Sequence, residues 1–201
     1  MKKIINVPFI SQMPELPRGC EVTSLAMLLN YYEVDIDKLT LAKEIKRDKT
    51  PYKKENGKVY FGNPYKGFVG DMYSFDNPGL GVYYPAILDL ANKYSNNRAI
   101  NITRKNFDII LKYLSNNTPI WIITNDTFKE LSNEHWELWI TPSGPLNITM
   151  REHSVVLIGY DDDYIYFNDP LENYKESKYD IKNFKKAWEQ MGSQAIIIKE
   201  I

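Results

Sequence analysis

The sequence predicts an α+β fold in which several helices come first and a mostly antiparallel sheet follows. Two patterns carry this prediction. Apolar residues recur at helical spacing in the first part of the chain, whereas compact β-branched runs bounded by turns dominate the last part, at 118–125, 153–160 and 164–169. A run of helices followed by a run of strands is typical of α+β folds. No repeat or linker is evident, so residues 1–201 are expected to form one domain.

The first helix is expected to start at Cys20, after a loop rich in proline and glycine, and to end near Tyr32. Its apolar residues follow the i, i+3, i+4, i+7 spacing of a helix with one buried face: Val22, Leu25, Ala26 and Leu29. A second helix is expected near 36–46, with Asp35 or Asp37 as its cap. Further helices are expected at 86–94 behind Pro85, at 106–114 with a cap near Thr103, and at 181–191 with a stop at Gly192.

The expected strands begin with a short strand or extended segment at 4–10 and a buried strand at 118–125. Trp136–Thr141 predicts another strand, followed by a turn at 142–145. The strongest β pattern is the hairpin formed by 153–160 and 164–169, and a last strand is expected from 194 to the end.

Residues 47–85 combine many glycines and prolines with several aromatic side chains. The glycines argue against regular elements, and the aromatic residues argue against a disordered linker. A long irregular but ordered region is therefore expected, either as a groove wall or lid or as plain structural packing.

The composition is that of a globular protein, with 43% hydrophobic residues and a net charge of −1. No basic block is present, which argues against nucleic acid or an anionic membrane as the main partner. No 18-residue apolar span occurs, and the start MKKIINVPFI lacks the features of a signal peptide. The protein is therefore expected to be cytoplasmic as the sequence stands, or extracellular if a leader has been lost.

Cys20 is the only cysteine in the sequence, so it forms no intrachain disulfide. A cysteine in the first turn of a helix lies near free N–H groups and the positive end of the helix dipole. Both favour the thiolate, which is the nucleophilic form. The alternative is a small core residue, because free cysteine is among the most often buried residue types.

The search for a catalytic base is short because the chain has only two histidines, His135 and His153. His153 starts the first strand of the predicted hairpin and Asp169 follows the second, so a carboxylate and an imidazole lie at one end of the hairpin. With a three-residue loop at 162–164, the two lie on the same face, but ideal pairing separates them by about 13 Å along the strand. A bulge, a strong twist or an irregular strand end is needed to bring them together. The alternatives are an edge histidine and an aspartate that forms a turn before Pro170.

No metal or cofactor is expected. Asp161–Asp163 lack the spaced oxygens and the glycine of a calcium loop. The glycines between 57 and 81 are not followed by Gly-Lys-Ser/Thr, so no phosphate-binding loop is predicted. His135, in SNEHWELW, has no partner pattern and is expected to be a surface or packing residue.

The segments GCEVTSLAMLLNYY and EHSVVLIGYDDDYIYFNDP together resemble the C39-like family of papain-fold cysteine peptidases, in particular its bacterial C39-like 2 branch. The resemblance spans nearly the whole chain. It includes the glycine-rich and aromatic segment 61–87, the strand TPIWIIT and the ending NFKKAWEQMGSQAI.

This resemblance implies a papain-like fold and a cysteine peptidase or amide hydrolase that acts on a peptide or protein. It implies Cys20 as nucleophile, His153 as general base and Asp169 as the acid that orients the imidazole. Gln12 matches the oxyanion-hole glutamine of the family in type, although its loop to Cys20 is longer than in the exporter-linked peptidases. The Cys20 backbone N–H is the alternative donor. Two other functions remain open: acyl transfer or hydrolysis of a non-peptide amide by the same triad, and peptide binding without catalysis.

Overall fold

The computed structural model describes residues 3–200. Its helices are α1 (Cys20–Tyr31), α2 (Lys38–Glu44), α3 (Tyr84–Tyr94), α4 (Phe107–Ser115) and α5 (Ile181–Gln190), with a short 3₁₀ turn at Asn133–His135. Its strands are β1 (Lys3–Ile4), β2 (Arg47–Asp48), β3 (Lys53–Glu55), β4 (Lys58–Tyr60), β5 (Phe68–Val69), β6 (Ala99–Asn101), β7 (Ile120–Asn125), β8 (Glu137–Thr141), β9 (Gly144–Ile148), β10 (Glu152–Tyr160), β11 (Tyr164–Asn168), β12 (Ser177–Asp180) and β13 (Ala195–Ile198).

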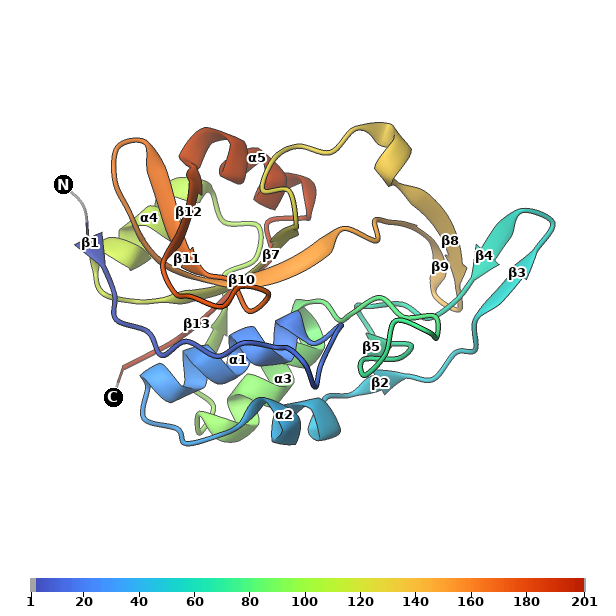
Figure 1. The fold of residues 1–201 in the computed structure, drawn as a ribbon, viewed down its shortest axis with the longest axis horizontal. Coiled ribbons are helices and arrows are strands. Elements are labelled where there is room, and N and C mark those ends of the chain that lie inside the picture. The colour runs from blue at the N-terminus through green and yellow to red at the C-terminus, as the bar shows by residue number, and fades with distance from the viewer. Residues whose placement is uncertain (1–2, 201) are drawn as a thin grey trace.

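The main sheet has the strand order β12-β11-β10-β7-β13-β6, and β1 adds to β10. All of its pairs are antiparallel. A smaller sheet, β3-β4-β8-β9, stands apart from the main body at one end of the molecule (Figure 1), and β2 pairs with β5 in parallel. The predicted α+β class with a mostly antiparallel sheet is therefore confirmed.

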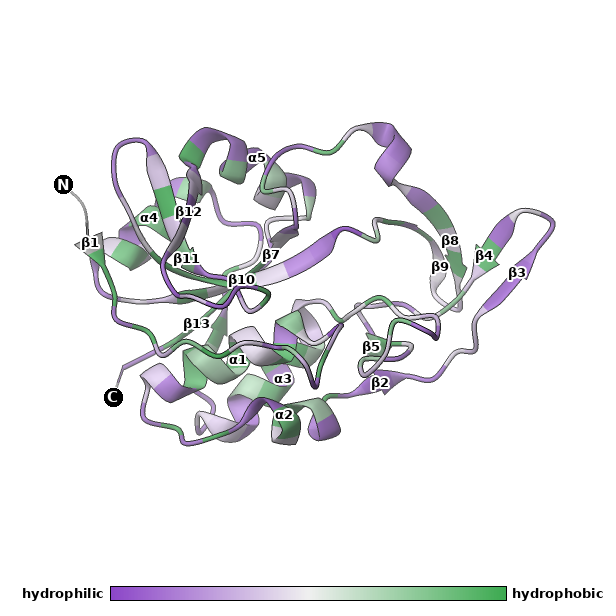
Figure 2. Cartoon of the chain, in the orientation of Figure 1, coloured by the Kyte–Doolittle hydropathy of each residue, from purple (hydrophilic) through white to green (hydrophobic). Residues whose placement is uncertain are grey.

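Helices cover both faces of the main sheet, which explains the uninterrupted apolar run of β7. Trp121 and Ile123 pack in one core cluster with α1, α2 and α3. Ile120 and Ile122 belong to a second cluster with α4 and α5. Alternate residues of a strand point to opposite faces, so the stretch 120–123 of β7, covered on both sides, is apolar at every position. The outlying β3 has no such cover and is hydrophilic throughout (Figure 2).

The helix predictions agree with the structure, including Asp37 as the cap of α2 and Pro85 in the first turn of α3. One cap was predicted wrongly. Asn106, not Thr103, caps α4, because its side chain accepts from Ile109 N at 3.1 Å. Of the short strand or extended segment predicted at 4–10, only the start is a strand: β1 ends at Ile4, and residues 5–12 have no regular element.

The prediction that residues 47–85 lack regular elements was wrong. They contain β2, β3, β4 and β5. The hairpin β3–β4 turns at Asn56 and Gly57, whose φ values are +51° and +75°. An Asn-Gly pair is the favoured sequence for a two-residue hairpin turn with positive φ at both positions. The short strands β6, β9 and β12 were also not predicted.

Candidate active site

Cys20 is the first residue of α1 and is 7% exposed. It lines a cleft of about 300 Å³ together with Gln12, Glu152 and His153. The rim of this cleft carries three exposed apolar side chains: Phe75, Met150 and Leu171. The predicted nucleophile and the predicted base therefore line the same cleft.

His153 and Asp169 are in direct contact at one end of the β10–β11 hairpin. His153 Nε2 lies 2.7 Å from Asp169 Oδ1, and the two residues are 2% and 5% exposed. Asp169 Oδ1 also accepts a hydrogen bond from Leu171 N at 2.9 Å, which fixes the carboxylate. Because Nε2 is engaged by Asp169, Nδ1 is the ring nitrogen left for other chemistry.

A change of register in the hairpin brings these two residues together. Val156 pairs with Asn168 and Leu157 with Phe167, but Gly159 pairs with Tyr166, so one extra residue of β10 is inserted at Ile158. Extending this register by one residue puts Asp169 next to Val155, only two residues from His153. That separation is about 7 Å along the strand, half the distance expected from ideal pairing, and it keeps both side chains on one face. The insertion at Ile158 accounts for one residue of this shift. The other comes from the loop, which has four residues between the paired Tyr160 and Ile165 and not the predicted three.

Asp161, the first aspartate after β10, has a structural role. Asp161 Oδ1 accepts hydrogen bonds from Asp163 N and Tyr164 N, and its Oδ2 accepts one from Tyr166 Oη at 2.7 Å. His135 is partly exposed, lies 3.9 Å from Glu134 and does not line the cleft.

Two glutamates that the sequence reading missed lie beside the sulfur. Glu21 is fully buried, and its Oε2 accepts a hydrogen bond from the Cys20 thiol at 3.4 Å. Its Oε1 accepts from Val82 N at 2.5 Å. Glu152 lines the cleft next to His153, and its enclosed Oε1 has no hydrogen-bond partner within residues 3–200. Side-chain ligand atoms of Cys20, Glu21 and Glu152 lie within 4.8 Å of one another, close enough to contact a single cation.

This environment opposes ionisation of all three groups. Burial raises the pKa of Glu21 to about 7, and burial together with the charge of Glu21 raises the pKa of Glu152 well above its usual value. Burial and then the charges of Glu21 and Glu152 raise the pKa of the Cys20 thiol well above its usual value. Burial and two nearby carboxyls therefore oppose the helix start, which was expected by itself to favour the thiolate.

The side chain of Gln12 lies in the cleft, but its amide nitrogen is engaged. Gln12 Nε2 donates to Leu16 O at 3.1 Å and to Pro17 O at 2.8 Å, and the residue is almost fully buried. Its Oε1 is enclosed without a hydrogen-bond partner among the described residues. In this conformation both N–H groups bind the loop, so an oxyanion would require one of them to turn.

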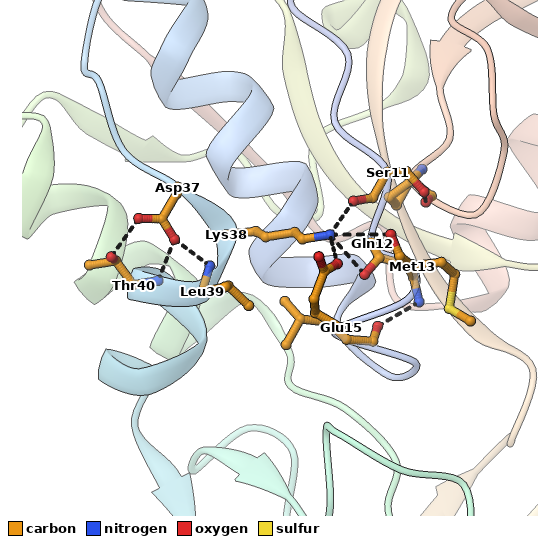
Figure 3. A network of polar contacts seen from close by, with 10 residues as sticks. Ser11, Gln12, Met13, Glu15, Asp37, Lys38, Leu39 and Thr40 are labelled. Atoms are coloured by element: carbon orange, nitrogen blue, oxygen red, sulfur yellow. Dashed lines mark hydrogen bonds and ion pairs between the residues drawn. The ribbon is translucent and has the colours of Figure 1, made fainter.

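The loop that carries Gln12 is held from two sides. On one side, Lys38 Nζ at the start of α2 contacts Ser11 O at 2.6 Å, Gln12 O at 3.0 Å and Glu15 Oε2 at 2.6 Å (Figure 3). On the other, Gln12 N and Ser11 Oγ both donate to Pro170 O, at 2.8 and 3.3 Å. The residue after Asp169 therefore anchors the loop that leads to Cys20.

The sequence offered only a weak signal for the two glutamates. An acidic residue in the first turn of a helix normally stabilises the helix dipole, which is the ordinary explanation of Glu21. Glu152 stands beside His153 without any recognisable pattern. Their proximity depends on the packing of α1 against β10 and on the segment that contains Val82.

Comparison with known proteins agrees with this architecture. The model of the Peptidase_C39 like family matches residues 4–196. The uncharacterised protein YvpB of Bacillus subtilis (strain 168) is 43% identical over 200 residues, which cover 98% of this chain and 76% of YvpB.

Two solved structures have a similar fold. A crystal structure from Bacillus anthracis, provisionally assigned as a C39-like peptidase, has a TM-score of 0.92 and 45% identity, over 100% of this chain and 98% of the other. A double-glycine-motif protease from an AMS/PCAT transporter, crystallised with its leader peptide, has a TM-score of 0.52 and 18% identity, over 98% and 96% of the two chains. At this identity the second similarity concerns the fold alone.

No helix within residues 3–200 is both long and apolar enough to cross a membrane. The family model covers almost the whole chain, and the fold matches that of a C39-like relative across its full length. The predicted resemblance is thereby confirmed, and the chain belongs to the C39-like peptidase family, with a papain-like fold.

Proposed function

We propose that the protein is a cysteine peptidase or related amide hydrolase that uses Cys20, His153 and Asp169 as its catalytic triad. One observation carries this proposal: the buried 2.7 Å contact between His153 and Asp169 lies in the same cleft as a cysteine at a helix start. A carboxylate that binds one imidazole nitrogen orients the ring and leaves the other nitrogen to act as a base.

The first step is attack by Cys20 on the carbonyl carbon of an amide. His153 Nδ1 takes the S–H proton as the C–S bond forms, since burial and the nearby carboxyls raise the pKa of the Cys20 thiol. Asp169 keeps Nε2 protonated and stabilises the imidazolium that results. The same proton then passes from Nδ1 to the leaving nitrogen, the C–N bond breaks, and a thioester remains on Cys20.

The oxyanion of the tetrahedral intermediate requires hydrogen-bond donors near Cys20. The Cys20 backbone N–H has no intrahelical acceptor because Cys20 is the first residue of α1. Gln12 becomes the second donor if one N–H turns from the loop carbonyls toward the cleft. Removal of one such donor typically lowers the rate by about 10²–10³.

Water completes the reaction. His153 Nδ1 takes a proton from water as the water oxygen attacks the thioester carbon. The C–S bond then breaks and the sulfur regains a proton, so that a carboxylic acid leaves and the free thiol returns.

The substrate we propose is a peptide segment. The cleft has an apolar rim, formed by Phe75, Met150 and Leu171, around a polar floor that contains Glu152 and His153. This arrangement suits a chain that presents both side chains and a backbone amide. Binding of a leader peptide by the distant transporter protease is compatible with such a ligand.

Covalent capture tests the proposal. A peptide library that carries an acyloxymethyl ketone should label Cys20 in the folded protein, as detected by intact mass and peptide mapping. Cys20→Ala serves as the blank. His153→Ala should lower the labelling rate by about 10²–10⁴, because the thiol then has no base. Labelling of His153→Ala at the wild-type rate would contradict the triad.

The captured sequences then allow the alternatives to be separated. The corresponding peptides should be hydrolysed by the wild-type protein and not by Cys20→Ala. Hydrolysis that gives way to amide formation when an amine is added would indicate acyl transfer. Tight binding without turnover, equal in wild type and Cys20→Ala, would indicate a peptide-binding module.

A further inference from the structure

We propose that Glu21 is a positioning residue for the nucleophile: its carboxylate holds the Cys20 thiol by its proton until substrate binds and His153 removes that proton. The contact is the hydrogen bond from Cys20 Sγ to Glu21 Oε2 at 3.4 Å. The inference rests on the proposed function for the nucleophilic role of Cys20. It adds a second carboxyl function to the site, distinct from that of Asp169.

Glu21 is fixed at three points, so its free oxygen has a defined direction. Its backbone lies in the first turn of α1, and its carbonyl accepts from Trp121 Nε1 at 3.0 Å. Its Oε1 accepts from Val82 N at 2.5 Å. With one carboxylate oxygen bound to Val82, the other faces the sulfur, and the thiol rotor is held in one orientation.

The backbone next to Val82 leaves room for the carboxylates only because residue 81 is glycine. A Cβ placed on Gly81 would collide with Glu21 Oε1 and lie 2.7 Å from Glu152 Oε2. The side chains of Glu21 and Glu152 therefore occupy space that any other residue at position 81 would fill. The glycine indicates that the carboxyl pair is built into the structure beside Cys20.

The charges around the sulfur explain what this contact does. The titratable groups that face Glu21 are Cys20 on the same helix, Glu152 and His153 on β10, and Tyr83 on the segment before α3. Of these, only His153 is able to carry a positive charge. A negative carboxylate against the sulfur opposes loss of the thiol proton to solvent but favours its transfer to His153, since the resulting imidazolium is attracted to Glu21.

The resting site is therefore a held thiol and not a preformed thiolate–imidazolium pair. Such a thiol reacts slowly with small electrophiles, because the thiolate is the reactive species. It becomes a nucleophile only when a bound amide places an electrophilic carbon beside it. Glu21 in this way restricts the reactivity of Cys20 to bound substrate.

The near-isosteric variant Glu21→Gln tests this role. The glutamine keeps an oxygen for Val82 N and turns an NH₂ group toward the sulfur, so the fold is preserved while the charge and the acceptor are lost. The rate of iodoacetamide alkylation, measured against pH, should shift to lower pH. At neutral pH the rate should rise at least about tenfold, because each unit in the thiol pKa is a factor of ten in thiolate.

Glu152→Gln is the matched control, because it removes a carboxyl from the same cluster that makes no hydrogen bond to Cys20 within the described residues. Its alkylation profile should shift less than that of Glu21→Gln. Equal shifts in the two variants would overturn the proposal, since total charge alone would then account for the effect. An unchanged profile in Glu21→Gln would overturn it as well.

A second measurement needs no variant of Glu21. Cys20 is the only cysteine, so the infrared S–H stretching band of the wild-type protein, minus that of Cys20→Ala, reports on this thiol alone. At neutral pH the band should be present and lowered in frequency relative to the same protein unfolded in denaturant, as a hydrogen-bonded S–H requires. A missing band, or one at the unfolded position, would overturn the proposal.

Neither readout depends on substrate turnover, so the two hypotheses fail separately. If the ketone library fails to capture Cys20 while the infrared and alkylation results hold, the proposed function is wrong and the thiol contact stands. If capture depends on His153 but the S–H band is absent, the triad stands and the role of Glu21 is wrong.

Discussion

Carboxyl groups flank the proposed reaction centre on two sides, and their surroundings differ sharply. Asp169 is held by two donors, His153 Nε2 and Leu171 N, and faces a group that is able to become positive. Glu21 shares its pocket with Glu152, and its contacts are a backbone N–H and a thiol. The same functional group thus supports proton removal at one side of the cleft and proton retention at the other. The neighbours of a carboxylate, more than its distance from the nucleophile, decide which role it has.

Substitution of Asp169 is expected to have the largest effect on the reactivity of Cys20. Asp169→Asn should lower the rate of covalent labelling of Cys20 by roughly tenfold to a hundredfold, because the imidazole loses a charge-assisted partner and its preferred tautomer. Labelling kinetics with the ketone probe measure this. Asp126→Asn is the control, since Asp126 also lines the cleft but is paired with Arg151 at 2.9 Å on its surface. Similar losses in both variants would mean that cleft charge, and not orientation of His153, is responsible.

The raised pKa of Glu21 predicts that the stability of the protein depends on pH. The pKa of Glu21 rises from its ordinary value of 4.5 to about 7 on folding, so between these values the folded state binds more protons than the unfolded state. Stability should therefore decrease as pH rises from about 4.5 to about 7, by at most about 1.4 kcal/mol per pH unit from this group. Urea unfolding across this range should show a flatter dependence in Glu21→Gln than in wild type. Identical slopes would show that Glu21 titrates normally.

The Gly81 backbone lies against the carboxylates of Glu21 and Glu152, so a methyl group at this position should destabilise the folded protein. Gly81→Ala should lower the free energy of unfolding by about 1–3 kcal/mol, the usual cost of forcing extra volume into a packed site. The cost should fall when Glu21→Ala is added, because the colliding carboxylate is then absent. A double-mutant cycle in urea measures this coupling. Strictly additive effects would refute the steric explanation.

The smallest expected effect concerns the loop before Cys20. Lys38→Met removes the ammonium that contacts Ser11, Gln12 and Glu15 and should cost about 1 kcal/mol of stability, because these contacts are partly exposed to solvent. The labelling rate should fall a few-fold as the loop becomes less ordered. Lys43→Met, an exposed lysine on the same helix, should change neither quantity. Equal effects would indicate a general influence of charge on α2.

Much of the site was predictable because it depends on local pattern. The helix start marks Cys20, and the hairpin marks His153 and Asp169 as neighbours. The insertion at Ile158, which together with the four-residue loop closes the gap between them, was inferred only as a requirement, because no residue type in VVLIGY identifies where a strand bulges. The Asn56–Gly57 turn was readable from sequence but was hidden by the many other glycines between 57 and 85.

The groups that surround the Cys20 thiol and raise its pKa were not predictable from the helix alone. The dipole of α1 acts locally, but Glu152 and Val82 reach Cys20 and Glu21 from distant parts of the chain. Whether a cysteine at a helix start is ionised depends on these tertiary neighbours. Periodicity in the sequence carries no information about them.

Pro170 O, which accepts hydrogen bonds from both Gln12 N and Ser11 Oγ, is synthesised long after the loop that it holds. It joins distant parts of the chain, since Ser11 and Pro170 are 159 positions apart. During translation, which proceeds from the N-terminus, Cys20 leaves the ribosome long before Asp169 has been made. A nascent chain therefore carries the thiol without the base, the acid or the anchor of the loop before it. On the proposed mechanism, hydrolytic activity therefore begins only after Asp169 has been synthesised and has reached His153.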